Sequence, residues 1–362
     1  MIFIYIILAL AVLVSIILNL PVFGKLPTGL RLTKIKNLPN YNNGAIQNNS
    51  ATPMQPEGIS FFTVLKAFLF EKYPNKIPNK VLPNVDPDLD GKPNSDNPEI
   101  IWFGHSSYLI KVNGLRILVD PIFSKTPSPF AFIGGKAFPG ATFTCADKFK
   151  NIDILLITHD HYDHLDYLSI LKIAPQAKKI VTSLGVGSHL EKWGVPFSKI
   201  EELCWLESIT LFNDLEITAV SARHFAGRKF VRNQTLWSAF IIQTEKFKLF
   251  IGGDSGYDTH FAEIGENYGP FDIAILECGQ YNAYWPYIHM YPEQTVQAAK
   301  DLNAKVLMPV HWGKFSLAMH DWDDPVKRVV AEAKKTNMPL VTPKLGETII
   351  LNKYMPTFNW WL

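Results

Sequence analysis

The sequence has few cysteines, no long basic run and no internal repeat of fixed period among its 362 residues. Its three cysteines, Cys145, Cys204 and Cys278, are far apart, and an odd number cannot all pair within one chain. We therefore expect buried thiols in a reducing compartment rather than a disulfide framework or a cysteine metal site. A net charge of +2 with 19% charged residues lacks the electrostatic signature of nucleic-acid binding, so no nucleic-acid partner is expected. The 47% hydrophobic content is enough for a large core, but nothing in the composition specifies an oligomeric state.

The first 24 residues contain no charged side chain. They also lack the basic start and the Ala-x-Ala site of a secretory signal. Residues 2–20 are the most apolar part and approach the roughly 20 residues that span a bilayer. We therefore predict that residues 1–24 form an uncleaved transmembrane anchor. Because the basic flank that follows should stay inside, the catalytic part should face the cytoplasm; a signal that delivers it to a periplasm is the alternative.

Residues 25–98 are predicted to be a linker, because they are rich in asparagine and proline. Within this linker the apolar stretch ISFFTVLKAFLFEKY, residues 59–73, is predicted to be a helix. It either docks on the main domain or lies on a bilayer surface. From residue 99 to residue 362, short apolar strands alternate with helices, and Asn113–Gly114 marks a hairpin turn. This mixture predicts an α/β catalytic domain built as a layered sandwich of mixed sheets.

Histidine and aspartate recur where the predicted strands end. The nine residues THDHYDHLD, residues 158–166, directly follow the apolar run IDILLI. Crowded imidazoles and carboxylates are costly to bury alone, and a bound cation would stabilise both. In layered α/β proteins, sites collect just beyond strand ends. Nitrogen and oxygen ligands without cysteine suit two ions of the zinc type that share one carboxylate. The candidate ligands are His159, His161, Asp163, His164, His224, Asp254 and His311.

The spacing within the histidine-rich stretch favours two neighbouring ions. His159 and His161 are separated by one residue, so in an extended segment they point the same way and can bind one ion. Asp163 and His164 lie at the turn into the next helix and can bind a second. A dinuclear hydrolase needs its ions about 3.5–4 Å apart, sharing an activated water. The alternative is an acidic turn that caps a helix, with the more distant residues unrelated to it.

The motif HDHYDH matches the metallo-β-lactamase signature His-x-His-x-Asp-His. More narrowly, the chain resembles the N-acyl-phosphatidylethanolamine-hydrolysing phospholipase D family. The further motifs that carry this resemblance are WFGHSSYLI, LVDPIFS, RHFAGR, GGDSGYD, GPFDIA and VHWGKF. The resemblance implies a four-layer αβ/βα sandwich. It also implies one zinc ion held by three histidines, a second zinc ion held by an aspartate and two histidines, and a bridging aspartate. The implied sets are His159, His161 and His224 for the first ion, Asp163, His164 and His311 for the second, and Asp254 as the bridge.

The resemblance further implies a phospholipid substrate at a membrane bilayer. A metal-bridging hydroxide would attack the phosphodiester, giving N-acylethanolamine and phosphatidic acid, with Asp254 as a catalytic residue. His289 is the candidate for protonating the leaving alkoxide and contacting substrate, because imidazole titrates near neutral pH. A histidine in a surface loop is the alternative for His289. A lactonase or a broad phosphodiesterase on the same fold is the alternative function, and a di-iron oxidoreductase or a non-catalytic binding protein is a more distant one.

Other residues near these motifs have less specific expectations. Tyr162, within the metal loop, is predicted to line the substrate pocket, and His105 to hydrogen-bond near the metals without binding them. His189, His260 and His320 are expected to be surface or helix residues. A group of aromatic side chains is expected either to receive acyl chains or to serve core packing or a lid. These are Tyr281, Tyr284, Trp285, Tyr287 and Tyr291.

Overall fold

The computed structural model describes residues 1–89, 91, 97–132, 134–143, 145–212 and 214–362. Residues 90 and 92–96, part of the predicted linker, lie outside the described residues. Within the described residues, the strands form two large sheets and one small hairpin, β1 (Tyr41–Asn42) with β2 (Ala45–Ile46).

The larger sheet contains seven strands within the described part of the chain, in the order β15-β3-β4-β5-β6-β7-β8. Strands β3, β4 and β5 form an antiparallel meander, whereas β5 to β8 run parallel. Val112 lies opposite Leu115, so Asn113 and Gly114 form the predicted hairpin turn, and both have the positive φ that such turns require. The strands are β3 (Glu99–Trp102), β4 (Tyr108–Val112), β5 (Leu115–Val119), β6 (Ile152–Ile157), β7 (Ala177–Ser183), β8 (Ile200–Leu203) and β15 (Thr348–Ile350).

The smaller sheet contains six strands within the same described ranges, in the order β14-β13-β12-β11-β10-β9. Its first three strands run parallel, and β11 is antiparallel to both β12 and β10. The carboxyl ends of β10, β12, β13 and β14 therefore share one edge of the sheet. The strands are β9 (Ser208–Leu211), β10 (Leu215–Val220), β11 (Ala239–Gln243), β12 (Lys248–Ile251), β13 (Ile273–Glu277) and β14 (Leu307–Val310).

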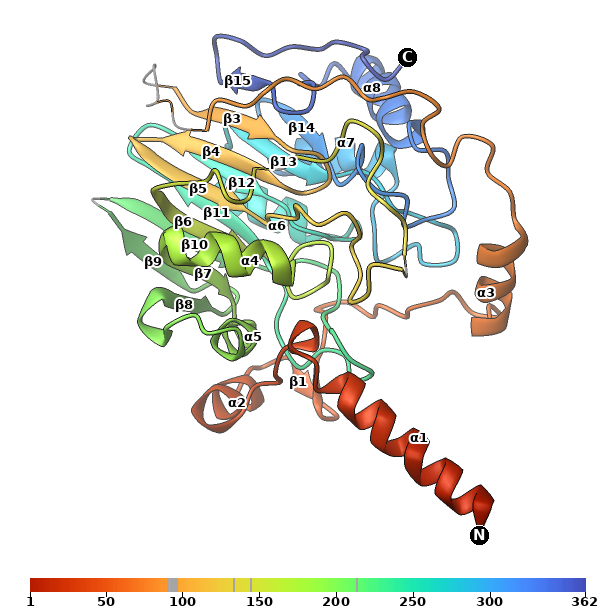
Figure 1. Ribbon diagram of the computed structural model, residues 1–362. Helices are drawn as coiled ribbons and strands as arrows, with labels where there is room; N and C mark the ends of the chain where they lie inside the picture. Colours follow the sequence, from red (N-terminus) through yellow and green to blue (C-terminus); the bar gives the residue numbers. More distant parts are fainter. Residues whose placement is uncertain (90, 92–96, 133, 144, 213) are drawn as a thin grey trace.

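The two sheets share a single hydrophobic core, which contains Leu155 of β6 and Phe250 of β12. Helix α5 contacts β8, and α7 contacts β13 and β14, so helices cover both sheets (Figure 1). Mixed sheets with helices on them are consistent with the predicted metallo-β-lactamase fold. The α-helices of the domain are α4 (Tyr167–Ile173), α5 (Gly187–Lys192), α6 (His260–Tyr268), α7 (Pro292–Asp301) and α8 (Asp324–Thr336). The 3-10 turns are η1 (Pro21–Phe23), η2 (Ala174–Gln176) and η3 (Phe197–Lys199).

The prediction of an N-terminal transmembrane anchor is wrong. Helix α1 (Ile2–Leu18) has 17 residues, with Asn19 as its C-cap, and Pro21 then begins η1. At 1.5 Å per residue it extends about 26 Å, short of a hydrocarbon core of about 30 Å. Among the described residues, no helix has both the length and the apolar character to cross a bilayer. The cytoplasmic placement of the catalytic part was inferred from this anchor, and it is withdrawn with it.

The chain that follows α1 is attached to the domain. The Trp193 indole donates a hydrogen bond to the Pro21 carbonyl oxygen, and the Arg228 guanidinium donates to Val22. Arg31, in α2 (Gly29–Lys36), forms an ion pair with Glu202. The end of the predicted anchor and the first part of the predicted linker thus contact the domain through polar groups.

The helix predicted within residues 59–73 is α3 (Phe61–Phe70). Ser60 caps its first turn by accepting a hydrogen bond from the Thr63 amide. Among its residues only Ala67 is buried, and Phe62 is 77% exposed. Docking on the domain therefore accounts for little of its apolar surface.

Candidate functional site

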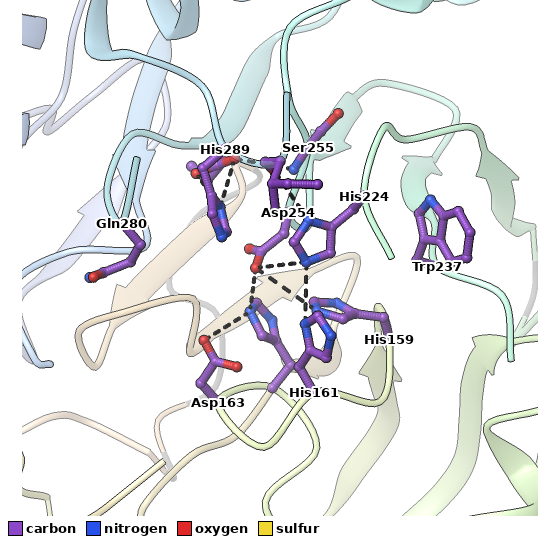
Figure 2. A network of polar contacts seen from close by, with 12 residues as sticks. His159, His161, Asp163, His224, Trp237, Asp254, Ser255, Gln280 and His289 are labelled. Carbon is purple, nitrogen blue, oxygen red and sulfur yellow. Dashed lines mark hydrogen bonds and ion pairs between the residues drawn. The ribbon is translucent and has the colours of Figure 1, made fainter. Parts of the chain in front are cut away.

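The predicted ligands lie where strand ends of the two sheets meet. His159, His161 and Asp163 come from the loop after β6, and they approach Asp254 and His224 from the smaller sheet (Figure 2). All seven candidates fall in groups whose ligand atoms lie within 4.8 Å of one another. Residues separated by up to 152 positions in the sequence thus converge because β6, β10, β12 and β14 end together.

The first group contains three imidazoles and one carboxylate. His161 Nδ1 lies 2.9 Å from His159 Nε2 and 3.2 Å from His224 Nε2. Asp254 Oδ2 lies 3.9 Å from His159 Nε2 and 3.7 Å from His224 Nε2. Ligands of a tetrahedral zinc ion at about 2.0–2.1 Å from the metal are spaced about 3.3 Å apart, so this spacing fits such an ion.

The second group lies on the other side of Asp254. His164 Nε2 is 3.1 Å from Asp254 Oδ2 and 3.7 Å from Asp163 Oδ2, and His311 Nδ1 is 3.2 Å from Asp254 Oδ1. Because Asp254 contacts members of both groups, its carboxylate is placed where one residue can serve two ions. His105 Nε2 is 2.9 Å from Asp163 Oδ2 and stands beside this group.

The electrostatics of the cluster also fit a cation. Asp254 Oδ1 is buried and accepts no hydrogen bond, which is costly for a carboxylate oxygen unless a cation neutralises it. Burial acts to raise the pKa of Asp254, but neighbouring His164 outweighs it and lowers that pKa to about 2. Burial lowers the pKa of His159, His224 and His311 well below the usual value. For these three histidines the neutral imidazole, beside an ionised Asp254, is the state that binds metal. Burial also acts to lower the pKa of His164, but Asp254 and Asp163 outweigh it and raise that pKa well above its usual value.

Buried hydrogen bonds orient the ligand rings. Asp120, which follows β5, accepts from the Thr158 amide at 2.8 Å, and its Oδ2 lies 2.8 Å from His164 Nδ1. Ser106 Oγ lies 2.9 Å from His311 Nδ1, and the Ile288 carbonyl oxygen lies 3.0 Å from His224 Nδ1. The partners of His164 and His224 occupy Nδ1 and leave Nε2 facing the cluster. Ser106 instead contacts the same His311 nitrogen that lies 3.2 Å from Asp254 Oδ1.

Sequence reasoning assigned no role to Asp120, although it follows a predicted strand as the other acidic candidates do. Asp120, His105 and His311 also have positive φ values of 39°, 52° and 67°. Non-glycine residues in this backbone region cluster at functional sites, because surrounding contacts must hold them there.

His289 lies beside the ligand cluster rather than on an open surface loop. Its ring centroid is 5.1 Å from that of His224 and 5.1 Å from that of His311. Its Nδ1 lies 3.2 Å from both carboxylate oxygens of Glu277, a second residue that sequence reasoning missed. Burial would lower the pKa of His289, but the ion pair with Glu277 outweighs it and raises that pKa to about 9. Burial raises the pKa of Glu277 to about 7.

The other predicted residues lie around this centre. The Tyr162 hydroxyl donates to the Arg228 carbonyl oxygen at 2.6 Å, so its polar end is occupied, and its role in binding substrate stays a prediction. His105 is fully buried, and its Nε2 lies 2.9 Å from Asp163 Oδ2. It also belongs to a group of possible ligands with Asp163, His164 and His311, so its role beside the metals rather than on them stays a prediction.

Of the three histidines expected on the surface or in helices, two lie in helices and one lies in a loop. His189 and His260 are in helices, but both are buried, and His189 pairs with Asp160 at 3.1 Å. His320 lies in a loop and accepts a hydrogen bond from the Gln280 amide.

The five aromatic side chains expected to bind acyl chains or to pack differ in their burial. Tyr281 is buried and stacks on His320, with a distance of 4.7 Å between ring centroids, so it belongs to the core. Tyr287 is exposed, and Tyr284 and Trp285 are half-buried on the loop before His289. Tyr291, also half-buried, is the N-cap residue of α7. The three cysteines are free and buried, as predicted.

Two packed mixed sheets with histidine and aspartate side chains gathered at their strand ends define a metal-dependent hydrolase of the metallo-β-lactamase fold. Residues 115–312 match the family described as the beta-lactamase superfamily domain, and the chain belongs to that superfamily.

The chain is similar to proteins from bacteria, animals and archaea. An uncharacterized protein of Mycobacterium tuberculosis is 35% identical over 327 residues, covering 89% of this chain and 87% of that protein. N-acyl-phosphatidylethanolamine-hydrolyzing phospholipase D 1 of Caenorhabditis elegans is 27% identical over 307 residues, covering 79% and 86%. Igni18, a metallo hydrolase of Ignicoccus hospitalis, has the same fold, with a TM-score of 0.54 at 23% identity and coverage of 70% and 98%. The resemblance predicted from the motifs is therefore confirmed.

Proposed function

We propose that this protein is a zinc-dependent phosphodiesterase of the phospholipase D type. Its substrate is an N-acyl-phosphatidylethanolamine-like lipid, and its products are an N-acylethanolamine and phosphatidic acid. The observation that carries the proposal is the convergence of seven histidine and aspartate side chains in two groups that both contact Asp254. The distant relatives that hydrolyse N-acyl-phosphatidylethanolamine support the choice of substrate.

We propose that His159, His161 and His224 hold one zinc ion, and Asp163, His164 and His311 a second, with Asp254 between them. Two bound zinc ions would lower the pKa of a shared water and neutralise charge on the phosphodiester. Burial lowers the pKa of His159 and His224, so their imidazoles stay neutral and a nitrogen lone pair of each is available to a metal ion. The hydrogen bond that His164 Nδ1 donates to Asp120 keeps Nε2 of that ring directed at Asp254.

His289 is the proposed general acid. When the bond from phosphorus to the ethanolamine oxygen breaks, that oxygen takes a proton from the imidazole, and His289 becomes neutral. The raised pKa of His289 keeps it protonated at neutral pH, which is the state a general acid needs. Its ring lies beside both His224 and His311, within reach of a phosphodiester bound between the two groups.

We propose that α3 contacts the bilayer from which the lipid comes. Phe61, Phe62 and Phe70 are 65%, 77% and 73% exposed, which is unusual for three phenyl rings on one short helix. Glu71, which ends α3, lies 3.4 Å from the Tyr284 hydroxyl on the loop before His289. A helix that inserts its apolar side chains into the lipid surface would hold that loop close to the substrate.

Replacing both Phe62 and Phe70 with serine should weaken binding to phospholipid vesicles by about 10-fold. Two phenyl rings buried in the lipid should contribute more than about 1.4 kcal/mol to the binding free energy. Turnover of a water-soluble phosphodiester should not change, because α3 carries none of the proposed catalytic groups. Co-sedimentation with vesicles and a colorimetric assay measure the two quantities. Phe197→Ser, which removes an equally exposed phenyl ring from η3, is the matched control. Equal vesicle binding by all three proteins would contradict the role of α3.

The function itself is tested by product analysis with purified protein of measured zinc content. We expect release of N-acylethanolamine and phosphatidic acid from N-acyl-phosphatidylethanolamine, and slower hydrolysis of bis(p-nitrophenyl) phosphate, which lacks the lipid chains. A lactone offered in the same assay should be stable. Cleavage of the lactone alone would reject the lipid substrate and favour the lactonase alternative.

A further inference from the structure

Glu277 is a carboxylate held wholly out of water at the end of a central strand. It is the last residue of β13, which lies between β12 and β14, and its side chain has no exposed surface. An ionised carboxylate in such a place is destabilising unless donors surround it. Three donors do: the His289 ring, the Ser255 amide and the Met290 amide, each at 3.2 Å.

These donors connect two segments of the candidate site. Ser255 directly follows Asp254, and Met290 directly follows His289. One carboxylate therefore ties the loop that carries the shared aspartate to the loop that carries the proposed general acid. The Thr295 hydroxyl also donates to the Glu277 carbonyl oxygen at 2.8 Å, so α7 fixes the backbone of the same residue.

The contact to His289 also determines which ring atom faces the cluster. Both Glu277 oxygens lie 3.2 Å from Nδ1, so Nδ1 carries a proton and donates it to the carboxylate. Nε2 lies on the far side of the ring, and Figure 2 shows the ring of His289 beside Asp254. His289, Asp254 and His311 each offer one atom within 4.8 Å of the others. Because Glu277 occupies Nδ1, Nε2 is the nitrogen of His289 left free to face the place where substrate would bind.

We propose that Glu277 is a positioning residue, which holds His289 through Nδ1 so that the Nε2 proton faces the oxygen that leaves phosphorus. This inference rests on the proposed function. A hydroxide oxygen would form a bond to phosphorus as the bond from phosphorus to the leaving oxygen breaks. The leaving oxygen takes the Nε2 proton, and His289 keeps its Nδ1 proton on Glu277. A carboxylate behind a histidine plays the same orienting role in other acid–base dyads.

Glu277→Gln keeps the shape and an acceptor oxygen but removes the charge. Turnover of a substrate with an alkyl alcohol leaving group should fall by about 10- to 100-fold, as for other partners that orient a functional histidine. Hydrolysis of bis(p-nitrophenyl) phosphate should change less than about 3-fold, because p-nitrophenolate leaves without a proton. In a His289→Asn background, Glu277→Gln should have no further effect. Glu266→Gln, on the exposed side of α6, is the matched control.

Equal losses on the two leaving groups, or additive losses in the double variant, would overturn the proposal and make Glu277 a structural residue only. A second readout does not need turnover. The Nδ1 proton of His289 should resonate downfield in the NMR spectrum, because its hydrogen bond is charge-assisted, and should move upfield in Glu277→Gln. If the unaltered protein hydrolyses no phosphodiester, the proposed function fails, and this spectrum still decides the Glu277–His289 pairing: an unchanged resonance contradicts it.

Discussion

Asp254→Asn should abolish the hydrolase activity almost completely. The substitution preserves size but removes the negative charge that both ligand groups contact, at 3.7 Å from His224 and 3.2 Å from His311. Removing a single electrostatic stabiliser of a transition state costs about 10²–10³-fold in turnover, and loss of a shared ligand should cost at least that. Metal content measured by elemental analysis should fall in parallel, because an amide oxygen is a weaker ligand for two cations than a carboxylate.

The control for this variant is Asp147→Asn. Asp147 pairs with Lys172 on the surface, and its side chain is 71% exposed, so the same chemical change there should leave activity and metal content intact. The folded state of both variants is checked by their melting temperatures. Unchanged turnover in Asp254→Asn, with metal content equal to that of the unaltered protein, would refute the proposed two-metal arrangement.

Removing the metal should eliminate activity and destabilise the fold. Each ion present at a thousand times its Kd stabilises the folded state by about 4.1 kcal/mol, because it binds the assembled ligands and not the unfolded chain. Prolonged dialysis against a strong chelator should therefore lower the melting temperature by several degrees. Added zinc should restore both the melting temperature and turnover, which scanning fluorimetry and the phosphodiester assay measure.

Asp254→Asn provides an internal control for the chelation experiment. Because that variant should already hold less metal, the chelator should lower its melting temperature by less than in the unaltered protein. Full activity in protein shown by elemental analysis to be metal-free would rule out a metal-dependent mechanism.

The local parts of the site were predictable from the sequence because their residues are neighbours in the chain. His159, His161, Asp163 and His164 occupy six consecutive positions directly after an apolar strand, so they share one short loop whatever the rest of the fold does. His224, Asp254 and His311 were predictable as candidates because each follows a predicted strand. Their proximity depends on β10, β12 and β14 sharing one edge, which is a property of the strand order.

Predictions of secondary structure and of a membrane span failed where the hydropathy of a segment differs from what the folded chain does with it. Hydropathy over residues 2–20 indicated a spanning helix, but Asn19 and Pro21 end α1 one turn too early. The strands β8, β9 and β15 and the helices α2 and α6 were not predicted. β9, for example, alternates exposed and half-buried residues and gains its hydrogen bonds only by pairing with β10.

By itself, the amino-acid sequence determined the class of this protein, because it shows which strands are apolar and where ligand-type side chains follow them. Only the tertiary structure decided which side chains stand behind the ligands. Asp120 reaches His164 across 44 positions, and Glu277 connects the loops of Asp254 and His289. Their roles depend on burial and on distances of about 3 Å between segments far apart in the chain, and no local pattern encodes such distances.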